Sequence, residues 1–468
     1  LKDPFVELVK GSLNTFLNAM TYPDRTCYPV ASCNDQDFQN LMHVYLDAVF
    51  YPNIYHKEEI FRQEGWNYHL EKKEGPLTYN GVVYNEMKGA FSSPDDVLER
   101  EIMNGLFPDN TYGVESGGDP NNIPELSYEE FLDFHRTYYH PSNSYIYLYG
   151  NMDMEEKLNF IDEKYLSAFD NLDVDSQIPK QPAFAQVKEF EKEYPVAENE
   201  EEEGKAFLSY NMVVGDAMDS MLGVAFDVLD YALLSAPGAP LKKALLDAGI
   251  GKDIYGSYND GFLQPYFSVI AKDARTEQKE EFVAVIRKVL QDIVQNGIDK
   301  KAILAGINYM EFRYREADFG SYPKGLMYGL DIIGTWLFDE NEPFAQVKLL
   351  DIYNRLKEAV NEGYFEGLIQ KWLLDNTHGS ILTLVPKKGL AAKREKELAD
   401  KLESFRSSLS DEQLEEMVRK TKALEEYQES EEKPEDIACI PMLKRSDIRK
   451  EVNGFSNEEL TVDDSLFL

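Results

Sequence analysis

The chain has 468 residues, of which 43% are hydrophobic and 28% are charged, so it can bury sizeable cores and is not a disordered protein. Its 85 Asp and Glu outnumber its 48 Lys and Arg, which gives a net charge of −37. This charge excludes nucleic acid and anionic membrane surfaces as favoured partners, because their phosphate groups would be repelled. Cationic peptides would instead be concentrated by an acidic cleft, although an acidic surface also serves solubility alone.

The three cysteines, Cys27, Cys33 and Cys439, are too few for a disulfide scaffold, and their spacing matches no zinc site. Such sparse usage is typical of a reducing compartment. We therefore expect a cytoplasmic protein or, alternatively, a protein of an organelle matrix. The chain contains no run of about 18 uninterrupted apolar residues, so the sequence predicts no membrane span.

The first part of the chain predicts a strand followed by helices. Leu13 to Met20 has the composition of a strand, and a turn is expected at 22–25. Apolar residues at helical spacing predict helices over 37–50 and 57–71. Asp35 or Asp37 would cap the first of these helices.

Residues 81–91 predict a short helix with a carboxylate beside its apolar stripe. The positions expected to point inward are Val83, Met87, Ala90 and Phe91. Glu86 borders this stripe and needs a partner, such as a base or a metal, because burying an unpaired charge is costly. Taken alone, the same pattern also fits an ordinary amphipathic helix with an acid at its edge.

A further helix is expected to begin at Ser93–Pro94, since Pro is favoured in a first helical turn. Tyr145 to Gly150 alternates like a strand and is expected to end the first unit. Residues 171–204 are rich in Pro and acidic residues, which predicts a linker.

A second unit at 205–390 repeats the order strand, helices, strand, helices, strand. The predicted fold class is therefore α+β, with two similar domains at 1–170 and 205–390. Each would be a mainly antiparallel sheet with helices on one face. Residues 391–433 predict an antiparallel helical hairpin restarted by Ser410, and 434–468 predict a tether without a core-forming pattern.

The histidines do not supply a zinc helix of their own. A motif of the type H-x-x-E-H places two His on one helix face with a Glu between them. The nearest approach begins at His56 and contains Glu59, but Ile60 stands where the second His is needed. The residues alone therefore predict an α+β protein of two similar domains plus a hairpin.

Several short segments within residues 4–143 carry a stronger indication when they are taken together. They are Pro4 to Leu8, Gly11 to Asp24, Asp37 to Leu41, Val44 to Ala48, Gln63 to Trp66, Val82 to Phe91, Ser116 to Pro120 and Tyr139 to Asn143. In this order they resemble the insulinase/pitrilysin superfamily of inverted-motif zinc peptidases, in particular its presequence protease and falcilysin branch. The resemblance continues more weakly through 238–245 and into the hairpin.

The resemblance implies a zinc ion held by two His of H-x-x-E-H and by a Glu from a later helix, and Glu86 matches that Glu. It also implies an edge strand on which extended peptides lie, joined by backbone hydrogen bonds. The substrate-binding positions that match this strand are Asn14, Phe16, Leu17, Asn18, Ala19 and Met20.

This chain departs from the family pattern because it contains no H-x-x-E-H motif, so its general base is not among these residues. We expect a chain that begins inside a domain and forms the N-terminal half of a longer enzyme, with the C-terminal half as its partner. The predicted function is a zinc-dependent metalloendopeptidase that degrades short unstructured peptides, some of them basic, in an enclosed chamber. This fragment alone is expected to be inactive. The alternatives are a non-catalytic relative that binds peptides or scaffolds a complex, and a generic α/β interaction protein.

Overall fold

The computed structural model describes residues 4–451, 454, 460–462 and 465–467. The largest sheet in this part of the chain has five strands in the order β7-β11-β8-β10-β9. They are β7 (Lys188–Val196), β8 (Ala206–Val213), β9 (Asp253–Asn259), β10 (Tyr266–Ala274) and β11 (Gly379–Lys388). Neighbouring strands are antiparallel except β7 and β11, which run parallel. We call residues 188–388 the sheet region.

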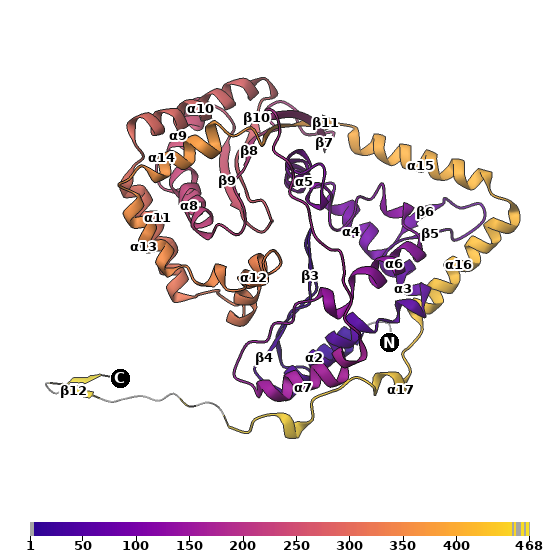
Figure 1. Cartoon of the computed structure of the whole chain (residues 1–468). Helices are drawn as coiled ribbons and strands as arrows, with labels where there is room; N and C mark the ends of the chain where they lie inside the picture. Colours follow the sequence, from indigo (N-terminus) through magenta and orange to yellow (C-terminus); the bar gives the residue numbers. More distant parts are fainter. Residues whose placement is uncertain (1–3, 452–453, 455–459, 463–464, 468) are drawn as a thin grey trace.

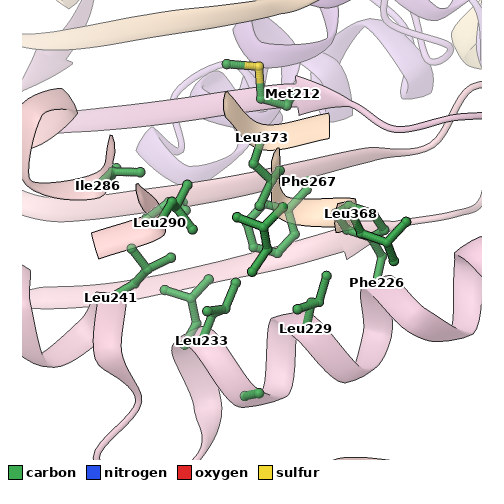
Figure 2. Packing of buried hydrophobic residues seen from close by; sticks show 14 of the residues in the cluster. Met212, Phe226, Leu229, Leu233, Leu241, Phe267, Ile286, Leu290, Leu368 and Leu373 are labelled. Atoms are coloured by element: carbon green, nitrogen blue, oxygen red, sulfur yellow. The ribbon is translucent and has the colours of Figure 1, made fainter. Parts of the chain in front are cut away.

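One face of this sheet is covered by a layer of helices (Figure 1). They are α8 (Ser220–Asp230), α9 (Pro240–Asp247), α10 (Lys279–Asn296), α11 (Lys300–Glu316), α13 (Leu350–Ala359) and α14 (Tyr364–Leu368). Figure 2 shows Phe226 and Leu229 of α8 packing towards Phe267 of β10. The stretch Ser220–Asp247 is long and apolar enough to cross a membrane. Part of this stretch is buried against the sheet. A buried core helix can have the same length and apolar composition as a membrane span.

The other face of the sheet is also buried, and the helix that covers it comes from the N-terminal part of the chain. This helix is α5 (Pro94–Leu106), capped by Ser93 as predicted. Its Ile102 and Leu106 share a core with Phe207 of β8 and Leu382 of β11. Burial on both faces explains why every residue of β8 is buried. The expectation of helices on one face only is therefore wrong for this sheet.

The N-terminal part, residues 4–170, is built differently, and we call it the first region. Its helices are α1 (Pro4–Val9), α2 (Asp35–Phe50), α3 (Glu58–Glu64), α4 (Val82–Ala90), α5, α6 (Tyr128–Tyr138) and α7 (Met154–Lys164). Its strands are β1 (Asn14–Leu17), β2 (Met20–Thr21), β3 (Thr26–Cys27), β4 (Val30–Ser32), β5 (Asn67–His69) and β6 (Thr78–Asn80). Within the described residues these strands form only two-stranded pairs. Two repeated domains are thus not shown.

Three predictions within the first region are wrong. The helix expected over 57–71 ends at Glu64, and Asn67–His69 then forms β5. Tyr145 to Gly150 is not a strand, because no described strand pairs with it. Its side chains pack instead on α12 (Lys324–Trp336), where Tyr145 contacts Trp336 with ring centroids 4.6 Å apart. Helix α2 is capped by Asn34 and not by Asp35 or Asp37.

The expected linker at 171–204 contains strand β7, so the prediction of a plain linker is wrong for 188–196. Phe190 and Tyr194 of β7 pack into the core beneath α5, while the charged residues between them face solvent. Such alternation is typical of an edge strand with one buried face.

The predicted hairpin is present as α15 (Leu390–Ser408) and α16 (Asp411–Glu429), and Ser410 forms the expected capping box with Gln413. It leaves the sheet after β11 and returns to the first region (Figure 1). There Leu402 and Leu414 pack on Leu70 and Leu77 beside β5 and β6. The buried Thr421 hydroxyl accepts a hydrogen bond from Leu70 N at 3.1 Å. The hairpin therefore ties the sheet region to the first region.

The segment after the hairpin, which the sequence predicts to be a tether without a core-forming pattern, packs in part on the first region. Helix α17 (Pro434–Ile437) begins it, and Ile440 is buried against Leu8 and Leu41 of the first region. The Asn34 side chain donates to Asp447 O at 2.8 Å. Strands β12 (Leu460–Val462) and β13 (Ser465–Phe467) pair near the end, and the rest of 452–468 lies outside the described residues, apart from 454.

Candidate functional site

Helix α4 carries Glu86 on a surface that is open to solvent. Gly81 precedes the helix with φ of +146°, where a side chain would collide with Gly65 O. The buried residue of α4 is Tyr84, which packs edge-on against Tyr79 at 5.6 Å. The predicted inward stripe is only half-buried, and Val82 is 43% exposed.

The Glu86 carboxylate is exposed and makes no hydrogen bond or ion pair with any residue in the described part of the chain. It is therefore free to accept an external ligand. The described residues place no base beside Glu86, so the metal expected as its partner stays a prediction, and the side chain remains hydrated instead of being buried.

A glycine-rich loop lies against α4. A Cβ added at Gly117 would lie 2.4 Å from Met87 Sδ, so a larger residue there would require the Met87 side chain to move. The Asp119 carboxylate accepts from Asn121 N at 2.8 Å and shapes the turn that follows. The Arg100 guanidinium of α5 lies 3.4 Å from the centroid of the Phe91 ring at the end of α4. These contacts attach helix α4 to the loop 116–120 and to α5.

The predicted substrate strand forms a two-stranded antiparallel ribbon, residues 14–21 and 26–32. β1 pairs with β4 and β2 pairs with β3. The Asn18 N–H donates to Pro29 O at 3.2 Å and joins the two pairs. Within the described residues the 14–21 side of the ribbon has no second strand partner. Its outer edge is therefore open, as an added peptide strand would require.

The ribbon is interrupted at Asn18 and Ala19, where a continuous strand was expected. The Ala19 N–H donates to the Asn18 side-chain oxygen at 2.9 Å. This local bond competes with strand pairing. Since Asn18 N points towards Pro29, the next N–H points towards the open edge. An incoming peptide would have to displace the Asn18 side chain to reach Ala19 N.

The other predicted binding residues divide between the two faces of the ribbon. Leu17 packs with Leu8 and Leu41 in the small core of the first region. Phe16 faces the sheet region, with its ring centroid 6.1 Å from that of Tyr322. Asn14 Nδ2 donates to Ser12 Oγ at 3.2 Å, and Met20 pairs with Cys27. The assignment of these residues to substrate stays a prediction.

Metal ligation is limited to Glu86 as a single candidate. No group of three or more His, Cys, Asp or Glu residues that could hold a metal occurs among the described residues. His135 bonds to Tyr55 and to Val49 O, while His378 is buried against Leu106 O. The described residues therefore do not fit a complete zinc site by themselves, since a catalytic zinc needs three protein ligands.

A second group of carboxylates, which the sequence did not single out, surrounds α8. Burial raises the pKa of Asp227 well above its ordinary value, with Asp260 and Asp230 adding to the shift. Burial also raises the pKa of Asp230 to about 6 and that of Asp331 to about 6. None of these carboxylates has a Lys or Arg ion pair within the described residues.

The comparisons with protein families give two matches. The model described as "Peptidase M16 inactive domain" matches residues 125–310. A second model, for the region associated with subfamily C of the M16 peptidases, matches residues 384–466.

Among curated proteins, Protein HypA of Clostridium perfringens is 51% identical over 462 residues, which cover 99% of this chain and 47% of HypA. Presequence protease 1, chloroplastic/mitochondrial, of Arabidopsis thaliana is 40% identical, over 96% of this chain and 42% of that protein. The mitochondrial presequence protease of Xenopus laevis is 32% identical, over 96% of this chain and 44% of that protein. The chain thus spans about half the length of the curated relatives it matches.

Among solved structures, a peptidase M16 inactive domain from Pseudomonas fluorescens superposes with a TM-score of 0.59 at 15% identity, over 81% of this chain and 83% of that one. A protease from Helicobacter pylori gives a TM-score of 0.58 at 17% identity, over 82% of this chain and 84% of that one. At these identities the likeness concerns the fold alone.

Proposed function

The chain belongs to the M16 (pitrilysin) peptidase family, in its presequence protease branch, and from this premise we propose that it forms part of a zinc-dependent endopeptidase. Its substrates would be short unstructured peptides, including basic ones. The single observation that carries the proposal is Glu86, a solvent-exposed carboxylate without a partner among the described residues, on a helix flanked by the loop 116–120.

Glu86 would supply one carboxylate ligand to the zinc ion. The remaining ligands and the general base would come from polypeptide outside these 468 residues, since the chain spans only 42–47% of the length of its most similar curated relatives. Zinc in such a site polarises the scissile carbonyl of a peptide. The role of this chain's own residues is to bind the ion at Glu86 and to hold the substrate.

The ribbon would bind the substrate as an added strand along the outer edge of residues 14–20. Backbone hydrogen bonds hold an extended peptide with little regard to its sequence. This mode suits unstructured peptides of varied composition. The net charge of −37 favours the approach of basic peptides.

A second candidate function is a non-catalytic subunit that binds peptides or scaffolds a complex. The observation that favours it is the match of residues 125–310 to a model described as an inactive domain. That match begins after Glu86 and the ribbon, however, so it does not bear on the residues to which we assign the chemistry.

The test is cleavage of an unstructured basic peptide by the complete polypeptide that contains this chain. The expected result is chelator-sensitive turnover that Glu86→Gln lowers by at least about a hundredfold, since one ligand charge is lost. The matched control is Glu163→Gln, which alters an exposed carboxylate on α7 and should leave turnover unchanged. Absence of turnover would favour the non-catalytic alternative, whereas turnover that is insensitive to chelators, or equal in both variants, would contradict the assignment of Glu86 as a zinc ligand.

A further inference from the structure

A buried tyrosine hydroxyl joins three segments that are far apart in the sequence. Tyr112 follows α5 and is 1% exposed. Its hydroxyl donates to Asp24 Oδ2 at 2.9 Å and accepts from Leu263 N at 3.1 Å. Asp24 lies in the turn between β2 and β3 of the ribbon, and Leu263 lies in the loop between β9 and β10. We call these contacts the Tyr112 junction.

The junction stabilises a buried charge at the tip of the ribbon. The Asp24 side chain is 1% exposed, and its Oδ1 accepts from Arg25 at 2.7 Å. The Tyr112 hydroxyl supplies the partner of the other oxygen. A buried carboxylate that loses such a donor is strongly destabilised, so the turn would no longer be held in place.

Burial, together with the neighbouring Asp24 carboxylate, raises the pKa of Tyr112. The phenol therefore keeps its proton at neutral pH and can act as the donor to Asp24. The same oxygen accepts the Leu263 N–H, so one atom bridges the ribbon to the sheet region.

Secondary contacts attach the turn to the same two segments. The Thr111 hydroxyl donates to Pro23 O at 2.9 Å, and Arg25 donates to Gly261 O at 3.4 Å. The ribbon tip is thus bound on one side by the segment after α5 and on the other side by the β9–β10 loop. Within the described residues its two strands otherwise pair only with each other.

The two segments that hold the ribbon tip are themselves held in place by hydrogen bonds that do not involve the ribbon. Asn110 Oδ1 accepts from Tyr112 N at 3.0 Å and caps this short turn. The buried Gln181 accepts from Asp109 N at 2.9 Å and donates from its own backbone to Gln264 at 2.6 Å. The segments on which Tyr112 and Leu263 lie are therefore already tied together without the ribbon.

We propose that Tyr112 is a positioning residue for substrate, because its hydroxyl fixes the ribbon tip on the sheet region and thereby fixes the open edge of residues 14–20 relative to Glu86. This inference rests on the proposed function, in which a peptide adds to that edge. Loss of the hydroxyl leaves intact the backbone groups of residues 14–20 that bind the peptide. The open edge, however, is no longer held in one position relative to Glu86. Substrate binding would then weaken while the reacting groups remain unaltered.

The first measurement is steady-state cleavage by the complete polypeptide carrying Tyr112→Phe. We expect KM to rise about tenfold, because one charge-assisted hydrogen bond is lost, and kcat to stay within about twofold of the wild-type value. The control is Tyr210→Phe. Tyr210 is equally buried, and its hydroxyl donates to Leu373 O at 2.6 Å within the main core. This variant should leave KM unchanged. An equal KM in Tyr112→Phe and wild type, or an equal rise in both variants, overturns the inference.

If Tyr112→Phe does not fold, Asp24→Asn replaces it, since the amide oxygen still accepts from Tyr112 but the charge is gone. We expect a smaller rise in KM for this variant, and an unchanged KM again overturns the inference.

The second measurement is amide hydrogen exchange on this chain alone, which does not depend on activity. Tyr112→Phe should speed exchange at ribbon amides such as Tyr22 N, which donates to Arg25 O at 2.8 Å. Tyr210→Phe should not. Unchanged ribbon exchange contradicts the positioning role, whatever the enzyme does. Faster exchange in a complete polypeptide that cleaves nothing supports the junction and overturns the proposed function instead.

Discussion

Leu229 of the sheet region and Leu41 of the first region are both 0% exposed, but they lie in very different surroundings. Leu229 belongs to a large cluster that joins one face of the sheet to its helices. The fully buried partners of Leu41 in its own cluster are Leu8 and Ile440. The region with the large core carries no candidate ligand among its described residues, whereas the region with the small core carries Glu86 and the ribbon.

This contrast shows how the candidate site is supported. The first region contributes α5 to the sheet, receives the hairpin on β5 and β6, and anchors its ribbon tip at the Tyr112 junction. Its order depends on these contacts with other parts of the chain more than on a core of its own. The edge that we propose to bind peptides therefore lies on a part of the molecule that can open locally without loss of the main core.

The largest expected effect is on stability and tests the contrast directly. Leu229→Ala should destabilise the chain by about 4 kcal/mol, because the surrounding core cannot close the cavity. Leu41→Ala should cost about 2 kcal/mol, since its smaller cluster can collapse around the change. Denaturant unfolding with probes in each region measures both values. Equal losses would mean that the first region has a core as cooperative as that of the sheet region.

A second prediction concerns the open edge of the ribbon. Ala19→Pro removes the N–H that points towards this edge, and we expect peptide affinity to fall about tenfold. Stability should change little, because Ala19 N bonds in this structure only to the neighbouring Asn18 side chain. Isothermal titration of an unstructured peptide, alongside a melting curve, separates the two effects. Unchanged affinity would remove the substrate role from this edge.

The smallest expected effect concerns the carboxylates of the sheet region. Burial raises the pKa of Asp230 to about 6, so the folded state holds a proton that the unfolded state releases nearer pH 4. Stability should therefore fall as pH rises from about 4 to about 6. Asp230→Asn should be more stable than the wild type at pH 7, and the difference should vanish near pH 4.

Asp292→Asn, an exposed position on α10, is the control for this pH dependence and should follow the wild-type curve. A wild-type stability that rises between pH 4 and pH 6 in parallel with the Asp230→Asn curve would show that Asp230 is ionised in the folded state at little cost.

Local patterns in the sequence predicted the elements whose partners are also local. The helix that begins at Ser93–Pro94 and the hairpin restarted by the capping box at Ser410 are present as expected. The failures at strands share one cause, which is that a strand needs a partner elsewhere in the chain. Tyr145 to Gly150 alternates like a strand but finds no described partner, while the acidic segment 188–196 finds β11.

The site was predictable only in part for the same reason. Helical spacing suggested a buried stripe at Val83 and Met87, but the buried residue of α4 is Tyr84. The match of Glu86 to a zinc ligand came from resemblance and not from periodicity. Tyr112 carried no local signal, because both of its hydroxyl partners come from segments at least 88 residues away.

The central claim is that this chain supplies one zinc ligand, Glu86, to a site completed by further polypeptide. The most direct measurement is zinc content after mild chelation of the 468-residue chain, the complete polypeptide and its Glu86→Gln variant. We predict one zinc per complete polypeptide, a strongly reduced content in Glu86→Gln, and none in the 468-residue chain, because one carboxylate cannot hold a catalytic zinc. Stoichiometric zinc in the 468-residue chain, or full retention by Glu86→Gln, would contradict the account.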